Sequence, residues 1–205
     1  MKSESIINKL DNIIPNPKCS LNYDKDYELL IAVMLSAQST DKRVNEVTPY
    51  LFKYNLNELA LLETSKIEDI IRPVGTFKRK ALYIKNIAKR ILEEADGIVP
   101  NNREFIESLD GVGHKTCNVV LSEIYNEPCI AVDTHVLRVS KRLGLVNKNA
   151  DVVNVEKKLM KLFPKDKWSR LHLQLVLFGR HFCKSRTPLC DMCPFKNMEC
   201  KKPLN

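Results

Sequence analysis

Hydrophobic residues recur along most of the chain at the spacing that places them on one face of an α-helix. The stretch YELLIAVMLSAQ, which begins at Tyr27, is apolar on nearly every side, as expected for a helix buried all round. Apolar positions in IKNIAKRILEE and VNVEKKLMKLF repeat every three or four residues, which predicts two amphipathic helices. LHLQLVLF (171–178) alternates at first like a strand, but we interpret it as a helix because no partner strand is evident. The only other strand-like run, CIAVDT, is too short to form a sheet, so the pattern predicts an all-α protein.

Prolines fall between the predicted helices and indicate where the chain turns. They are Pro15, Pro17, Pro73 and Pro100. The sequence contains no internal repeat, low-complexity segment or flexible Gly/Ser linker. It therefore predicts two helical lobes that share a cleft, which is a common place for a ligand site.

The composition favours a folded protein that binds polyanions. The chain has 205 residues, 44% of them hydrophobic, which suits one compact domain or two small ones. Its 33 Lys and Arg residues outnumber 25 Asp and Glu residues, for a net charge of +8. Nucleic acid is the commonest polyanionic partner, although a basic surface can also serve solubility alone.

The sequence shows neither a targeting segment nor a membrane span. The N-terminal MKSESIINKLDNII lacks the continuous apolar core of a signal peptide. The longest apolar run, 29–35, is far shorter than the ~20 residues that cross a bilayer. We expect a cytoplasmic protein with no membrane partner.

Four of the seven cysteines lie close together near the C-terminus, in CKSRTPLCDMCPFKNMEC. They are Cys183, Cys190, Cys193 and Cys200, with the spacing C-x6-C-x2-C-x6-C. Without an export signal the thiols should be reduced, so this cluster predicts a metal site rather than disulfides. Zinc and a [4Fe–4S] cluster both accept four cysteines, and the single C-x2-C pair favours iron–sulfur. Basic residues such as Lys184 and Arg186 in the same segment suit a loop that faces DNA.

The segment LDGVGHKTCNVV combines two glycines with a lysine, Lys115. A nucleotide-binding P-loop is excluded, because one residue separates the glycines and His114 stands before the lysine. The remaining geometry is a helix, a short glycine turn and a second helix. Backbone N–H groups at Gly111 and Gly113, with the start of the second helix, would form an anion site that fits a DNA phosphate. The alternative is an ordinary turn between helices.

Lys115 and Asp133 are candidate catalytic residues. A lysine at a helix N-terminus feels the positive end of the helix dipole, which favours the neutral amine that can form a Schiff base. Asp133, in AVDTHVLR, could take up a proton nearby or stabilise a sugar cation. The alternatives are a surface lysine that touches phosphate and an aspartate that only caps a helix.

Taken together, these motifs resemble the endonuclease III family of helix-hairpin-helix DNA glycosylases. LLIAVMLSAQSTD, LDGVGHKTCNVVL, IAVDTHVLRVSKRLGL and the terminal cysteines match that family in order and approximate spacing. The resemblance covers about residues 20–200. It implies a six-helix barrel over 21–129 that contains the helix-hairpin-helix, and an iron–sulfur cluster domain formed by 1–20 and 130–205.

The resemblance also implies roles for individual residues. Lys115 and Asp133 take the catalytic positions, and the four clustered cysteines take those of the [4Fe–4S] ligands. Gln38 matches a glutamine that fills the gap left by the extruded base. The implied DNA contacts are Gln38, Thr76, Phe77, Gly111, Val112, Gly113, His114, Lys184 and Arg186.

Two positions depart from the family pattern. Thr76 stands where relatives often place a leucine that wedges into the base stack, so Phe77 would assist or the opposing base would be recognised differently. The last cysteine gap holds six residues where the family usually has five, which a bulge in the loop would absorb.

The implied function is a bifunctional DNA glycosylase and AP lyase that removes oxidised pyrimidines from duplex DNA in base excision repair. Its partners would be double-stranded DNA carrying an oxidised pyrimidine or an abasic site, and we expect a monomer associated with the nucleoid in the cytoplasm. A monofunctional adenine-type glycosylase is the first alternative, although it lacks a lysine at the Lys115 position. A non-catalytic helix-hairpin-helix DNA-binding protein and a zinc-stabilised DNA-binding protein are the others.

Overall fold

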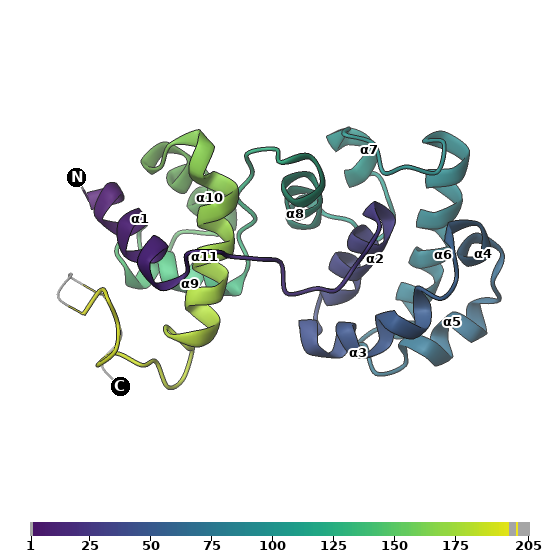
Figure 1. Cartoon of the computed structure of the whole chain (residues 1–205), viewed down its shortest axis with the longest axis horizontal. Helices are drawn as coiled ribbons and strands as arrows, with labels where there is room; N and C mark the ends of the chain where they lie inside the picture. The colour runs from purple at the N-terminus through teal and green to yellow at the C-terminus, as the bar shows by residue number, and fades with distance from the viewer. Residues whose placement is uncertain (1, 197–199, 201–205) are drawn as a thin grey trace. The chain divides into compact units, whose positions relative to one another are not determined.

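The computed structural model describes residues 2–196 and 200, with side chains described from residue 3 (Figure 1). These residues form eleven α-helices and one short 3₁₀ helix, and none of them lies in a strand. The predicted all-α class is therefore confirmed. The helices divide between two compact units, one made of residues 19–125 and the other of residues 1–18 together with 126–205.

The unit formed by residues 19–125 is a bundle of seven helical segments. It contains α2 (Asp26–Ser36), α3 (Asp41–Leu51), α4 (Leu56–Leu61), α5 (Thr64–Ile71), α6 (Phe77–Glu94), α7 (Arg103–Glu107) and α8 (His114–Tyr125). The resemblance implies six helices in this unit, whereas the structure has seven. The difference arises because short helices are counted, such as α7 with only five residues.

Helix α2 lies at the centre of this unit and packs against α3, α6 and α8 (Figure 1). Every residue from 27 to 35 is buried, which confirms that this stretch is a helix covered on all sides. The helix begins after Lys25, where Glu28 Oε2 accepts the amides of Asp24 (2.8 Å) and Lys25 (3.2 Å). It ends at Ser36, so Gln38 follows it in a turn.

The unit formed by both ends of the chain has its own hydrophobic core. It contains α1 (Lys2–Ile13), α9 (Thr134–Arg142), α10 (Val152–Leu162), the 3₁₀ helix η1 (Lys165–Lys167) and α11 (Trp168–His181). The segment LHLQLVLF lies within α11, so its prediction as a helix is confirmed. CIAVDT is not assigned to a strand, and its last residue, Thr134, begins α9.

Helix α11 joins the two chain ends, because it packs against both α1 and α9. Asp11 of α1 accepts hydrogen bonds from Arg170 Nε (2.7 Å) and from Gln174 Nε2 (2.8 Å). Phe195 is fully buried, and its ring packs edge-on against Phe178 with 5.2 Å between centroids. The segment that carries the clustered cysteines is therefore anchored in the core of this unit.

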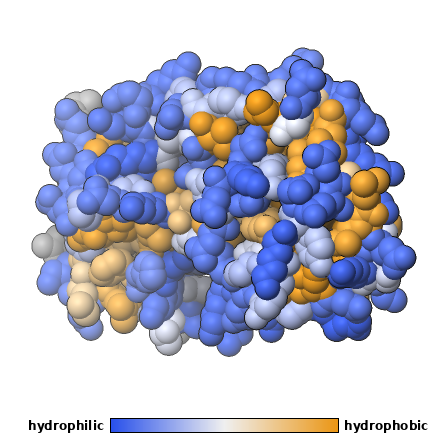
Figure 2. Space-filling model, turned by 45° about the vertical axis from the view of Figure 1, so that its right-hand side comes forward, coloured by the Kyte–Doolittle hydropathy of each residue, from blue (hydrophilic) through white to orange (hydrophobic). Residues whose placement is uncertain are grey.

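Hydrophilic residues cover most of the face drawn in Figure 2, with hydrophobic ones exposed between them. The most exposed large hydrophobic side chains include Leu61, Ile98 and Met192. Within the described residues, no helix is both long and apolar enough to span a membrane.

Candidate functional site

The glycine turn that connects α7 to α8 contains one glycine required by packing, Gly111. Its φ is +73°, in the left-handed region that favours glycine. A Cβ built there would lie 2.5 Å from Cδ2 of Tyr83 and 3.3 Å from Cγ of Met34. The expected backbone conformation, closed to most other residues, is therefore confirmed at Gly111, and the Cβ side of this residue faces Tyr83 and Met34.

Gly113 differs from Gly111 both in its backbone conformation and in the space around it. Its φ is not in the left-handed region, and a Cβ at this position would meet no atom within 4 Å. The first backbone bond of the next helix runs from Cys117 N–H to Gly113 O (3.0 Å), so the amides before Cys117 have no intrahelical acceptor. Such amides form an anion site. Val112 between the glycines buries its side chain and donates its amide to Leu109 O (3.1 Å), which stabilises the turn.

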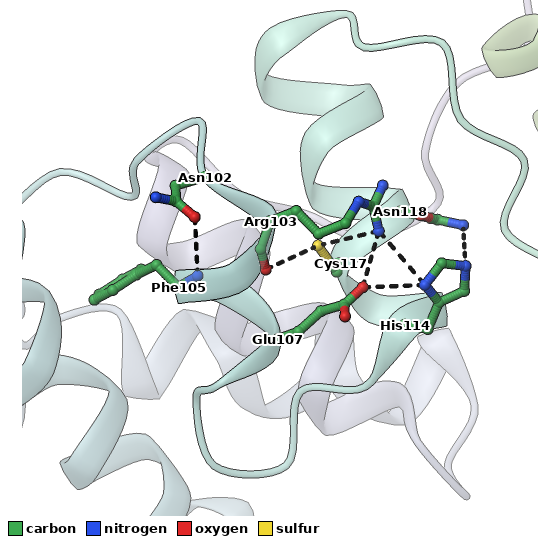
Figure 3. Close-up of polar contacts among 7 residues, drawn as sticks. All are labelled: Asn102, Arg103, Phe105, Glu107, His114, Cys117 and Asn118. Carbon is green, nitrogen blue, oxygen red and sulfur yellow. Dashed lines mark hydrogen bonds and ion pairs between the residues drawn. The ribbon is translucent and has the colours of Figure 1, made fainter.

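His114 opens α8 and is held by side chains from both helices of the hairpin (Figure 3). Its Nδ1 lies 3.0 Å from Glu107 Oε1, and its Nε2 lies 3.3 Å from Asn118 Nδ2. Arg103 Nη1 donates to the same Glu107 oxygen at 2.9 Å. Burial raises the pKa of Glu107, but hydrogen bonds from Arg103 and His114 outweigh that effect and leave the pKa lowered. These contacts fix the start of α8 against α7, immediately before Lys115.

Lys115 is the second residue of α8 and is half-buried. The sequence placed the helix start near this residue, and the structure confirms it. The side chain therefore leaves the backbone in the first turn of α8, at the positive end of the helix dipole.

Asp133 caps α9, in the unit formed by the chain ends. Its Oδ1 accepts the amides of His135 and Val136, both at 2.8 Å. Both bonds end on the same oxygen, so the helix cap leaves Oδ2 available. Burial lowers the pKa of His135, nearby Arg138 and Arg180 add to this, and Asp133 opposes it. The structure thus confirms that Asp133 caps α9, and Oδ2 of its carboxylate takes no part in the cap.

Gln38 and Thr76 occupy two neighbouring turns, after α2 and before α6. Both are exposed, and both have φ of +57°, which is unusual for residues other than glycine. The two turns touch, because a Cβ at Gly75 would lie only 3.2 Å from Gln38 O. Phe77 is half-buried, with the Arg72 guanidinium 5.6 Å from its ring centroid.

The four clustered cysteines line a single pocket in the unit formed by the chain ends. Its other walls come mainly from apolar residues such as Phe178 and Phe182. Burial raises the pKa of the Cys193 thiol, and the neighbouring Cys183, Cys200 and Cys190 add to it. Among the described residues, no group of three or more His, Cys, Asp or Glu side chains is arranged so that it could hold a metal ion. Four thiols around one pocket nevertheless form a donor set that suits zinc or a [4Fe–4S] cluster.

Two arginines of α9 hold the beginning of the cysteine loop. Arg142 Nη1 lies 3.4 Å from Cys183 Sγ and donates to Lys184 O at 2.7 Å. Arg138 Nε donates to Cys183 O at 3.1 Å. Lys184 and Arg186 are exposed in this loop, as a contact with phosphate requires.

A family model describing the HhH-GPD superfamily of base excision DNA repair proteins matches residues 31–165. The chain is 42% identical over 197 residues to endonuclease III of Bacillus subtilis (strain 168), covering 95% of this chain and 90% of that protein. It is 40% identical over 200 residues to endonuclease III of Synechocystis sp., covering 96% of this chain and 91% of that protein.

Solved structures of endonuclease III with DNA are also similar to this chain. The fold superposes on a non-covalent endonuclease III–DNA complex with a TM-score of 0.93 and 39% identity, covering 98% of this chain and 95% of that one. It superposes on a trapped covalent intermediate of endonuclease III with DNA with a TM-score of 0.91, at 39% identity over 98% of this chain and 96% of that one. The chain therefore belongs to the endonuclease III family, within the HhH-GPD superfamily of base excision DNA repair proteins.

Proposed function

We propose that this protein is a bifunctional DNA glycosylase and AP lyase that removes oxidised pyrimidines from duplex DNA, with Lys115 as its nucleophile. The observation that carries the proposal is the position of Lys115, half-buried in the first turn of α8 directly after the glycine hairpin. An adenine-type glycosylase would have no lysine at this position.

The hairpin binds the DNA backbone. Gly113 has open space where a side chain would stand, and backbone amides at the start of α8 donate to a phosphate. His114, held by Glu107 and Asn118, lies at the same helix end. Contacts of this kind read no sequence, and they weaken steeply as the salt concentration rises.

The turns that carry Gln38 and Thr76 act on the base pair. Extruding a nucleotide costs a few kcal/mol, and the gap in the stack must be filled. Gln38 is exposed and fills the gap, while Thr76 and the half-buried Phe77 face the opposing strand. Thr76 is too short to wedge deeply, so damaged pairs that stack poorly are the preferred substrates.

The chemistry requires an amine and a proton acceptor. The Lys115 amine forms a bond to C1′ of the deoxyribose, and the damaged base leaves with the electron pair of the glycosidic bond. Asp133 Oδ2 accepts the proton that the attacking amine loses, while Oδ1 keeps the cap of α9. The C1′–O4′ bond of the sugar then breaks, with Asp133 returning the proton to O4′, and this opens the ring to a protonated imine between Lys115 and C1′. The imine acidifies the C2′ proton, and loss of that proton breaks the C3′–O3′ bond, expels the 3′ phosphate and cuts the strand.

The four cysteines would hold a [4Fe–4S] cluster. When bound, the cluster would cross-link the four cysteines and so organise the segment that carries them. Its role would be structural, because neither imine formation nor β-elimination is a redox reaction. Arg142 and Arg138 hold the first residue of this loop against α9. Lys184 and Arg186 are thereby presented to the DNA backbone.

One chain supplies all the residues proposed here, so we propose that the protein works as a monomer. Its substrates would be duplex DNA with an oxidised pyrimidine or an abasic site, which places it at the nucleoid in the cytoplasm. The separate roles of the two units, a helix-hairpin-helix unit and a cluster unit, are part of the same proposal.

Borohydride trapping on duplex DNA that carries an oxidised pyrimidine tests this proposal. Wild type should give a covalent protein–DNA adduct, and Lys115→Gln should give none while still binding abasic DNA. Lys89→Gln is the matched control, because Lys89 is exposed on α6. An adduct from Lys115→Gln would place the nucleophile elsewhere. No adduct from either protein, with binding intact, would favour a monofunctional glycosylase or a DNA-binding module.

A further inference from the structure

A buried lysine, Lys80, lies in the first turns of α6 and has no part in the chemistry above. The residue is 4% exposed. Its amine donates to two main-chain oxygens, Leu35 O at 2.8 Å and Ala37 O at 2.5 Å. Burial, followed by the charge of nearby Arg79, lowers the pKa of Lys80 to about 8. A hydrophobic side chain at this position could not make these two hydrogen bonds.

The two acceptors are at the C-terminal end of α2, immediately before Gln38. The last carbonyls of a helix have no intrahelical donor, and they carry the negative end of the helix dipole. The amine of Lys80 satisfies both carbonyls at once. A hydrophobic residue of similar length would leave these carbonyls without that donor.

Lys80 also contacts the second turn. Its amide makes the first backbone bond of α6, to Thr76 O at 3.1 Å, so its side chain links the start of this helix, where the turn of Thr76 lies, to the end of α2. Both Gln38 and Thr76 have φ of +57°. A non-glycine residue in that conformation is strained, and it persists only where its surroundings impose it. The close approach of Gly75 to Gln38 O, 3.2 Å from a Cβ built there, shows how little freedom the pair of turns has.

We propose that Lys80 is a positioning residue, which fixes the turns of Gln38 and Thr76 relative to one another so that both enter the duplex together and extrude the damaged nucleotide. The inference rests on the proposed function, in which these two turns contact the DNA. It assigns Lys80 no contact with DNA. Without the clamp, the two turns move independently, and the duplex is opened less often for each binding event.

The test compares Lys80→Met with a matched control, Lys85→Met, on two substrates. Lys85 lies on the same helix and donates to Leu62 O at 3.0 Å, so its replacement removes the same kind of bond at the end of α4, away from the two turns. The first substrate is a duplex with a paired abasic site. The second carries a bulged abasic nucleotide with nothing opposite, which is already out of the stack. Single-turnover strand cutting is measured on both, and 2-aminopurine emission opposite the lesion reports the opening of the stack.

Lys80→Met should raise the ratio of the bulged rate to the paired rate at least about tenfold over wild type, the scale expected when a buried charge-assisted hydrogen bond is lost. Its 2-aminopurine signal should fall in parallel, and Lys85→Met should leave the ratio as in wild type. An equal loss on both substrates, or an unchanged ratio, would overturn the role of Lys80.

Two further measurements keep the result interpretable. If Lys80→Met does not fold, Lys80→Gln takes its place, because an amide can donate to one of the two carbonyls and should give a smaller change in the same ratio. An unchanged ratio in that variant would also overturn the inference. Wild type should form a borohydride adduct on the bulged substrate. Its absence would overturn the proposed function itself, which separates that failure from a failure of Lys80 alone.

Discussion

Replacing Gly111 by alanine should destabilise the fold, whereas the same change at Gly113 should spare the fold and weaken DNA binding. The two glycines are separated by one residue, yet their surroundings differ. Gly111 has φ of +73°, and an added methyl group would meet the Tyr83 ring at 2.5 Å and 2.8 Å. At Gly113 the methyl group would meet nothing within 4 Å.

The cost at Gly111 has two parts. The left-handed conformation costs an alanine about 1–2 kcal/mol. Displacing the half-buried Tyr83 ring adds about 1–3 kcal/mol. A total of about 3 kcal/mol would lower Tm by roughly 10 °C in a chain of this size. At Gly113, alanine in place of glycine before a helix costs less than about 1 kcal/mol.

Gly97→Ala separates the two parts of the Gly111 cost. Gly97 also has a left-handed φ, +80°, but the nearest atom to an added Cβ is Leu92 Cδ2 at 3.9 Å. This variant should lose only the backbone contribution, about 1–2 kcal/mol. The difference between Gly111→Ala and Gly97→Ala then measures the contact with Tyr83.

Thermal unfolding followed by circular dichroism measures stability, and fluorescence anisotropy with undamaged duplex DNA measures binding. Gly113→Ala should unfold close to the wild-type temperature and bind about tenfold more weakly, as expected for one lost charge-assisted phosphate contact. The reasoning is refuted if Gly111→Ala and Gly113→Ala unfold at the same temperature. Wild-type affinity in Gly113→Ala would refute the phosphate site at this turn.

Three other predictions follow from separate parts of the molecule. Asp133→Asn should keep the cap of α9 and the wild-type Tm but should no longer form the borohydride adduct. Asp133→Ala should lose the adduct and, in addition, about 1 kcal/mol of stability. Adduct formation by the Asn variant would contradict the role of Oδ2. Because the pKa of Lys80 is lowered from 10.5 to about 8, the unfolded chain binds the extra proton between these values. Urea midpoints should therefore show wild type gaining stability relative to Lys80→Met as the pH rises through that range, and a constant difference would contradict the burial of the amine. Protein purified without oxygen should be brown and contain iron and sulfide, and Cys193→Ala should lose that colour; a colourless wild type containing zinc would identify the other metal.

The fold and the hairpin were accessible from the sequence because the signals are local. The apolar run of α2 predicts complete burial, and the glycines before Lys115 predict a turn that opens a helix. The alternation in LHLQLVLF misleads only at first, since no strand is available to pair with it. Asp133 illustrates two interpretations that the sequence could not separate, a cap and a reactive carboxylate. The structure shows one oxygen engaged in the cap and the other available.

Other features depend on contacts between segments far apart in the chain, which no local pattern reveals. The need for glycine at position 111 comes from Tyr83, a residue of α6. The network around His114 involves Glu107 and Arg103, for which the sequence offers only their helical spacing of four residues. Lys80 carried a signal that is easily overlooked, because it lies four residues before Ile84, on the buried side of α6. Its acceptors, at the end of α2, could be identified only in three dimensions.

The unit formed by both chain ends has a consequence for the order in which the protein is completed on the ribosome. Helix α1 is synthesised before its partners, since its buried residues Ile6 and Leu10 pack in a core built from α9, α10, α11 and Phe195. Residues 19–125 can fold as soon as they emerge, while α1 waits for its partners for roughly ten to forty seconds at ordinary rates of synthesis. The cysteines of the pocket emerge after α11. A nascent chain thus exposes one apolar helix face until α9, α10 and α11 have been made, and the unit that carries Asp133 closes only after these helices have emerged.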